Sequence, residues 1–362
     1  MLTAVVGINW GDEGKGRMVD LFSAEHEIVV RYQGGNNAGH TVVNERGKFI
    51  LNLLPSGILR PGTVNVLGPG MVLDLEHLTN EVAHIREQGV AITPEHLKIS
   101  DRATICMPYH KMMDILEEDR LADKKFGSTR RGIGPVYADK YMKKTLRTGD
   151  LLFPDKLREK LADLVEWKNI TVQGYGHEPV SVDEMYAWLE KYAFPWREYL
   201  CNTTEYLSAQ ADAGKSILFE AQLGALRDID FGIYPYTSSS STIAAYAPIG
   251  AGIPAKRLDS VVGIMKAYSS CVGEGPFVCE LFGEEGDRLR EAGAEVLGVA
   301  SIFTYGMQKG LDRMREANVT NYSLSNLDAL VEVAAEEGYI KPEDKARLIA
   351  FRNNPSDESW MQ

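Results

Sequence analysis

The 362-residue sequence lacks the features that mark membrane-spanning and secreted proteins. No apolar run approaches the roughly 20 residues needed to cross a bilayer. Its first residues, MLTAVVGINWGDE, contain neither the basic start nor the cleavage site of a signal peptide. The 4 cysteines show no CxxC spacing, which favours buried thiols over disulfides or a metal site. We therefore expect a cytoplasmic protein.

Positive charge is also scarce. The 39 Lys and Arg residues are outnumbered by 51 Asp and Glu residues, the formal net charge is −12 at pH 7, and no basic cluster is present. This balance argues against nucleic acid or an anionic membrane as a partner. A hydrophobic content of 44% and a charged content of 25% are typical of a soluble globular protein with a large core, for which we expect a small-molecule ligand.

Short apolar runs alternate with amphipathic stretches along the chain, without an internal repeat. Patterns typical of buried strands occur at residues 3–8, 27–32, 216–221 and 260–265, and helical patterns at 73–88 and 108–121. This alternation predicts an α/β fold with a largely parallel central sheet.

Two further stretches qualify this organisation. Residues 151–213 are rich in helix signals and in aromatics, without a flanking linker, and we interpret them as a helical insertion in a single large domain that covers residues 1–362. Near the end, residues 318–330 predict one more strand and a turn, and residues 341–352 predict a helix with Pro in its first turn.

The stretch VVGINWGDEGKGRMVD, residues 5–20, is similar to a phosphate-binding loop, but Gly16 stands where a Ser or Thr normally follows the lysine. In such a loop, backbone N–H groups and the lysine hold phosphates, and the missing hydroxyl would bind Mg²⁺. Asp12, inside the loop, is able to replace that oxygen or to act as a base. The alternative is a Gly-rich turn without a ligand.

Six stretches together resemble the adenylosuccinate synthetase family, from residue 3 to about residue 295: WGDEGKG, GGNNAGHT, LLPSGIL, GSTRRGIGPVYADK, DIDFGIYPY and KAYSSCVGEGPF. The resemblance implies a homodimeric, Mg²⁺-dependent ligase of purine biosynthesis. In that family a nucleoside triphosphate phosphorylates O6 of a 6-oxopurine 5′-monophosphate. The amine of L-aspartate then displaces the phosphate from C6.

The resemblance also implies roles for individual residues. Asp12 corresponds to the general base and a Mg²⁺ ligand, Lys15 to the phosphate-binding lysine, His40 to the group that stabilises the transferred phosphoryl, and the Gly39 carbonyl to a second Mg²⁺ ligand. The implied triphosphate site consists of Asp12, Glu13, Gly14, Lys15, Gly16, Gly39, His40, Thr41, Asn326, Asp328 and Asn354.

The purine monophosphate site implied by the resemblance shows departures from the family pattern. Its members are Asn37, Thr129, Arg130, Lys143, Gln222 and Thr237. The family's FEGAQG is FEAQLG here, so Leu223 takes the column of the glutamine that contacts O6, and Gln222 lies one residue earlier. Lys143 replaces an arginine that reaches the 5′-phosphate across the dimer, and it lacks the arginine's bidentate fork.

The amino-acid pocket departs furthest from the family. After REAGAE the chain reads VLGVASIFTYG, without the family's threonines and arginines that bind the aspartate carboxylates. The remaining candidates are Thr129, Arg130, Arg131 and Val272, and the alternatives are backbone N–H groups around Gly298 and the hydroxyls of Ser301 and Thr304. We expect aspartate to bind with a KM in the millimolar range.

The phosphate donor and the purine substrate both stay open. The family's guanine-reading TKLD appears as SNLD at 325–328, and its SNGP-like turn as RNNP at 352–355, so either ATP or GTP is compatible with the sequence. The departures are also similar to a phage branch that joins aspartate to dGMP in the host cytoplasm, although the intact Asp12 argues for IMP. Two other functions are a nucleotide-binding NTPase or regulator that has lost the aspartate site, and a ligase that uses another amine.

Overall fold

The computed structural model describes residues 1–37, 39–44, 47–122, 127–265, 299–304, 312, 315, 321–337, 339–341 and 343–353. The chain divides into two compact units. The first contains the described residues up to 265, and the second those from 299 onward. The single domain expected over residues 1–362 stays a prediction.

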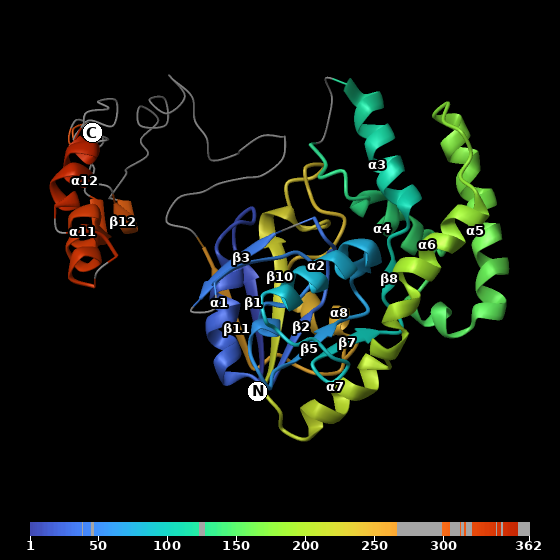
Figure 1. The fold of residues 1–362 in the computed structure, drawn as a ribbon, viewed down its shortest axis with the longest axis horizontal. Helices are drawn as coiled ribbons and strands as arrows, with labels where there is room; N and C mark the ends of the chain where they lie inside the picture. Colours follow the sequence, from blue (N-terminus) through green and yellow to red (C-terminus); the bar gives the residue numbers. More distant parts are fainter. Residues whose placement is uncertain are drawn as a thin grey trace. The chain divides into compact units, whose positions relative to one another are not determined.

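A seven-stranded sheet forms the centre of the first unit, and all its strands run parallel in the order β11-β1-β10-β2-β5-β7-β9 (Figure 1). Its strands are β1 (Leu2–Gly7), β2 (Ile28–Arg31), β5 (Val64–Leu67), β7 (Leu97–Ser100), β9 (Leu200–Cys201), β10 (Ile217–Gly224) and β11 (Ser260–Ile264). This confirms the predicted α/β class and the four predicted strands. The expectation that residues 260–265 are buried is wrong, because β11 is an edge strand with Val261 half exposed.

Helices cover both faces of this sheet, as the alternation of side chains along its strands requires. On one face, α1 (Lys15–Phe22) contributes to an apolar cluster of Val5, Val19, Val29 and Leu218. On the other face, α7 (Thr203–Asp212) and α8 (Ala247–Ala251) contribute Leu207, Ala247 and Ala251 to a second cluster. The central strands are therefore buried on both sides.

A helical region extends from the β7 side of the sheet around the largest apolar cluster (Figure 1). Its helices are α2 (Leu75–Glu87), α3 (Pro108–Leu121), α4 (Ile133–Met142), α5 (Pro154–Gly174) and α6 (Val182–Tyr192). The helices predicted at 73–88 and 108–121 are confirmed. The insertion at 151–213 is helical as expected, but it also contains β9, which adds the last strand to the sheet.

Short strand pairs complete the first unit. β3 (His40–Asn44) and β4 (Gly47–Leu51) form an antiparallel hairpin, and β6 (Val72–Leu73) pairs with β8 (Thr104–Ile105). None of the described helices is long and apolar enough to cross a bilayer.

The second unit pairs β12 (Val299–Thr304) in parallel with β13 (Asn321–Asn326), followed by α11 (Leu327–Glu336) and α12 (Asp344–Asn353). The strand predicted within 318–330 is confirmed, and the turn predicted in the same stretch stays a prediction, because residues 318–320 lie outside the described residues. Asn326 Oδ1 accepts the Ala329 N–H at 2.9 Å and caps α11, so the helix begins directly after the strand. The helix expected at 341–352 is present as α12, which begins at Asp344.

The carboxyl ends of β1, β2 and β10 lie next to one another, because β10 pairs in parallel with both other strands. In open parallel sheets, ligands bind outside this edge. The chain leaves these strands through residues 8–14, 32–39 and 225–238, which contain Asp12, Glu13, Gly14, Asn37, Gly39 and Thr237 from the predicted site.

Candidate functional site

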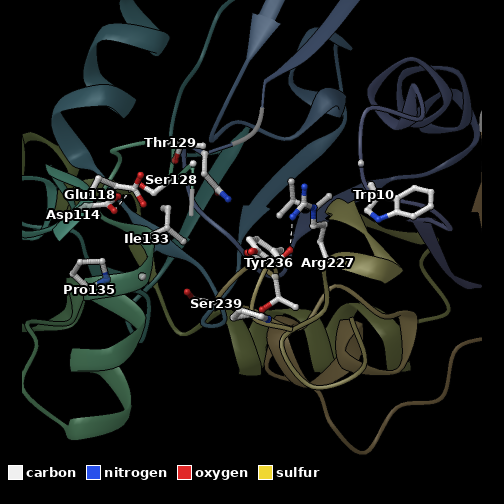
Figure 2. Close-up of a pocket in the computed structure, with 18 of the residues that line it drawn as sticks. Trp10, Asp114, Glu118, Ser128, Thr129, Ile133, Pro135, Arg227, Tyr236 and Ser239 are labelled. Carbon is white, nitrogen blue, oxygen red and sulfur yellow. Dashed lines mark hydrogen bonds between the residues drawn. The ribbon is translucent and has the colours of Figure 1, made fainter. Parts of the chain in front are cut away.

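A cavity of about 490 Å³ opens at this edge of the sheet (Figure 2). Five of the residues singled out in the sequence line it: Asp12, Asn37, Gly39, Thr129 and Thr237. They come from the loops after β1 and β2, the segment before α4 and the serine-rich run after β10. The fold therefore brings together residues that are more than 200 positions apart in the chain.

The loop after β1 is built around the carboxylate of Glu13. Its oxygens accept the N–H groups of Asn9 at 3.1 Å and Gly11 at 2.8 Å, and the Lys15 ammonium lies 2.6 Å away. Burial lowers the pKa of Lys15, although the ion pair with Glu13 opposes this shift. Glu13 thus shapes the loop and holds the lysine at the start of α1.

The glycine that replaces the usual Ser or Thr has a steric cause. A Cβ atom at Gly16 would lie 2.7 Å from Cβ of His40, closer than real side chains approach. The His40 side chain therefore occupies the space in which a residue with a hydroxyl would stand. The loop has exchanged a hydroxyl for an imidazole.

His40 is held by a buried carboxylate. Its Nδ1 lies 2.7 Å from Glu220 Oε1, and Glu220 also accepts the backbone N–H and the hydroxyl of Ser56. Burial alone would raise the pKa of Glu220, but the hydrogen bond from His40 and the nearby Arg31 outweigh it and lower the pKa. Because an ionised Glu220 only accepts hydrogen bonds, Nδ1 of His40 carries a proton.

The pKa of His40 itself is lowered, chiefly by burial and against the pull of Glu220. The neutral imidazole then has its proton on Nδ1 and a bare lone pair on Nε2. Nε2 becomes a donor only when a second proton is taken up.

Asp12 is exposed at the cavity with φ of 58° and makes no hydrogen bond to the other residues that the structure describes. The Gly39 backbone lines the same cavity. A free carboxylate and a backbone carbonyl are hard oxygen ligands, and Mg²⁺ is often held by one or two protein oxygens together with substrate phosphates and waters. The donor set fits Mg²⁺ on these grounds, although no cluster of three or more His, Cys, Asp or Glu suited to a metal occurs among the described residues.

The segment with Thr129 is anchored by Asp114 of α3. Asp114 accepts the Ser128 hydroxyl at 2.7 Å and the Gly132 N–H at 2.8 Å, on either side of Thr129. Sequence reasoning did not single out Asp114. Its signal was weak, since it is one of several acids in an amphipathic helix.

Arg130 and Arg131 are both exposed next to this segment. Arg130 has φ of 55°, and its guanidinium donates to Asp119 at 3.0 Å. The Arg131 side chain has no hydrogen-bond or ion-pair partner within the described part of the chain. Arg131 is therefore the more accessible cation.

Gln222 and Leu223 face in different directions. Gln222 is fully buried, and its Nε2 donates to the carbonyls of Gly35 and Asn52 behind the cavity wall. Leu223, with φ of 58°, lines the cavity. The wall at the end of β10 therefore presents an apolar side chain where the family column has an amide.

Arg227, which sequence reasoning missed, also lines the cavity and is only 8% exposed. It ends η6 (Ala225–Arg227), and its Nη1 donates to the Tyr236 carbonyl. Figure 2 draws Arg227 and Tyr236 between Trp10 and Thr129. The signal was an arginine three residues after the end of a buried strand, in the stretch FEAQLGALRDID.

The remaining sequence-predicted residues lie elsewhere or outside the description. Lys143 is exposed at the C-terminal end of α4, and Thr41 lies in β3. In the second unit, Asn326 caps α11 and Asp328 forms an ion pair with Arg352. Val272 and Asn354 lie outside the described residues.

Comparisons with known proteins place the sequence in a family. A family profile described as adenylosuccinate synthetase matches residues 4–301. Adenylosuccinate synthetase 2 of Pseudoalteromonas translucida (strain TAC 125) is 48% identical over 294 residues, which cover 80% of this chain and 69% of that protein. The adenylosuccinate synthetase of Lactococcus lactis subsp. lactis (strain IL1403) is 42% identical over 340 residues, covering 90% and 76%.

Solved structures share the fold. The fully ligated adenylosuccinate synthetase of Plasmodium falciparum matches with a TM-score of 0.71 and 33% identity, covering 81% of this chain and 68% of that one. The succinoaminodeoxyadenylate synthetase of cyanophage S-2L, bound to dGMP and dATP, matches with a TM-score of 0.51, covering 89% and 91%, but its 19% identity supports a common fold alone. Since the profile spans most of the chain and relatives exceed 40% identity, the chain belongs to the adenylosuccinate synthetase family, the C–N bond-forming ligases of purine biosynthesis.

Proposed function

We propose that the protein joins L-aspartate to C6 of a 6-oxopurine 5′-monophosphate, with ATP or GTP as the phosphate donor. The observation that carries this proposal is the single cavity in which Asp12 lies with Asn37, Thr129 and Thr237. Deprotonation of a bound purine requires a base within reach of the ring, and these amide and hydroxyl groups are suited to hold a nucleotide next to it.

In this proposal Asp12 removes the N1 proton of the purine. The electrons of the N1–H bond make O6 nucleophilic, O6 attacks the γ-phosphorus, and the nucleoside diphosphate leaves. The aspartate amine then attacks C6 and loses a proton as the C6–N bond forms. The C6–O6 bond breaks, and its electron pair leaves with inorganic phosphate. Lys15 and the protonated His40 offset charge on the phosphates.

The Asp12 carboxylate and the Gly39 carbonyl would hold a Mg²⁺ ion. When bound, that ion would neutralise charge on the triphosphate. The site also needs cations for the two carboxylates of aspartate, and Arg131 and Arg130 supply them next to Thr129. We further propose a homodimer, in which Lys143 serves the 5′-phosphate in the site of the other protomer.

Phosphate release tests this function directly. IMP, dGMP and GMP are each supplied with ATP or GTP, with and without aspartate, and succinyl product is followed by mass spectrometry. We expect release to require both a purine monophosphate and aspartate, and the names of the relatives favour IMP over dGMP. Triphosphate turnover without a purine monophosphate would instead support an NTPase, and product with another amine would remove aspartate from the proposal.

A further inference from the structure

The wall of the cavity at residues 223–227 combines two unusual neighbours. Leu223 presents an apolar side chain at the carboxyl end of β10, and the amide of Gln222 is turned away and bound by main-chain carbonyls. Neither side chain is placed to donate a hydrogen bond to a purine oxygen in this cavity. A site that recognises a 6-oxopurine needs such a donor, because the carbonyl at C6 distinguishes the base.

Arg227 places a guanidinium in the same wall. The side chain is 8% exposed, and its hydrogen bond to the Tyr236 carbonyl fixes its direction. This bond orients the guanidinium within the cavity wall. The main chain is held as well, since the Ser238 N–H donates to the Arg227 carbonyl at 2.8 Å. Tyr236 and Ser238 also line the cavity.

The chemistry of the guanidinium matches one edge of the proposed substrate. A 6-oxopurine presents O6 and N7 as two adjacent acceptors, and arginine binds this pair with two parallel N–H groups. When N1 loses its proton, negative charge develops on O6, and a positively charged donor at O6 stabilises that charge.

We infer that Arg227 is the specificity-determining residue for the 6-oxopurine, and that it donates to O6 and N7 where Leu223 offers no hydrogen bond. This inference rests on the proposed function, because it assumes that the cavity binds the purine monophosphate. Arg227 selects the base in this arrangement, while Thr129 and Asn37 hold the rest of the nucleotide.

Binding of the purine monophosphate, measured without a phosphate donor and without aspartate, tests the inference separately from catalysis. Calorimetry compares IMP with purine riboside 5′-monophosphate, which lacks O6, and with 7-deaza-IMP, which lacks N7. We expect the wild-type protein to bind IMP roughly 5- to 140-fold more tightly than the analogue without O6, the range of a bidentate arginine contact. The 7-deaza analogue should fall between them.

The Arg227→Leu variant should bind IMP and purine riboside 5′-monophosphate almost equally, and Arg227→Lys should keep part of the preference. Arg158→Leu, at an exposed arginine of α5 that pairs with Asp183, is the matched control and should keep the wild-type preference. Circular dichroism and the Tm establish whether each variant is folded.

Three outcomes would overturn the inference. Equal binding of IMP and the analogue without O6 by the wild-type protein would do so even if no Arg227 variant folds. A folded Arg227→Leu variant that still prefers IMP to the analogue without O6 would do so too. So would an equal loss of affinity for IMP and for that analogue in this variant, because it would show that Arg227 binds the phosphate. Failure of the proposed function differs from all three, because then no purine monophosphate binds.

Discussion

Asp12 stands at the residue scale as a carboxylate without a hydrogen-bond partner among the described residues, in a loop whose other acid, Glu13, is fully engaged. If Asp12 is the base, Asp12→Asn keeps the shape of the loop and removes the proton acceptor. We expect turnover to fall by roughly 10² to 10⁴, with nucleotide binding little changed. Initial rates at saturating Mg²⁺ test this. A variant that keeps more than about a tenth of wild-type turnover would contradict the role, and Asp183→Asn, an exposed acid of α6, is the control.

His40 leads to a prediction about protons. Its pKa lies below the ordinary value in the free protein, so at pH 7 the imidazole is neutral and Nε2 has no hydrogen to donate. The negative charge of a bound triphosphate raises that pKa, so binding takes up a proton and should tighten as the pH falls from 8 to 6. Calorimetry in two buffers of different ionisation enthalpy measures the uptake.

The triphosphate itself also titrates in this range, so the His40→Asn variant is the reference. It should show less uptake than the wild-type protein, by up to one proton. His84→Asn, at an exposed histidine of α2, should behave as wild type. Equal uptake in all three proteins would assign the proton to the ligand alone.

The two arginines after Thr129 differ in availability. Arg130 is paired with Asp119, whereas Arg131 has no partner in the described part of the chain. We expect Arg131→Ala to raise the KM for aspartate by about 10- to 150-fold, the loss of one charge-assisted hydrogen bond, and Arg130→Ala to raise it less. The KM values of both nucleotides should change little. Aspartate kinetics that are unchanged in both variants would remove these arginines from the amino-acid site.

At the scale of elements, three helices are joined by a buried cluster of charged groups. His110 of α3 accepts the Met107 N–H on Nδ1 and donates from Nε2 to Asp139 of α4 at 3.0 Å, while Lys168 of α5 lies 2.5 Å from the same carboxylate. Burial lowers the pKa of His110, although Asp139 opposes the shift. This cluster fixes α4, and with it the segment that carries Thr129.

The sign of the pH effect follows from that shift. The unfolded chain binds a proton at His110 at higher pH than the folded chain does, so the free energy of unfolding falls as the pH drops below about 6.5. Removing this titration with His110→Gln should reduce the slope by up to about 1.4 kcal/mol per pH unit. Urea unfolding between pH 7 and 5 measures it. His84→Gln should leave the slope unchanged, and a wild-type slope in His110→Gln would refute the effect.

At the scale of the whole molecule, the family resemblance predicts that Asn326 and Asp328 of the second unit select the phosphate donor. Asn326 caps α11 and Asp328 is paired with Arg352, so an Asp328 that reads the N1 and N2 hydrogens of guanine would first have to leave that ion pair. We predict that ATP is used at least as well as GTP. Competing kcat/KM values decide this, and a value for GTP more than about tenfold above that for ATP would contradict it.

The Asn326→Lys variant restores the family residue at this position. It should shift the kcat/KM ratio toward GTP, while Asn80→Lys, at an exposed position of α2, should not. An unchanged ratio in Asn326→Lys would place donor selection elsewhere in the chain.

The sequence alone predicted the parallel sheet and the loop with Asp12, because strand periodicity and glycine spacing are local signals. It missed Arg227, because only the fold brings the end of β10 next to Thr129 and Trp10. The sequence also could not predict the direction of the Gln222 side chain. Side chains alternate along β10, so a shift of one residue decides whether a side chain points into the cavity or away from it.

The close approach of Gly16 and His40 makes the hydroxyl loop and the imidazole loop mutually exclusive. A serine at position 16 would collide with Cβ of His40, and a smaller residue at position 40 would remove the imidazole without supplying a hydroxyl. Sequences on a path between the two would need both changes together. We therefore expect that no single substitution at position 16 or position 40 converts this loop into an ordinary NTP-hydrolysing loop.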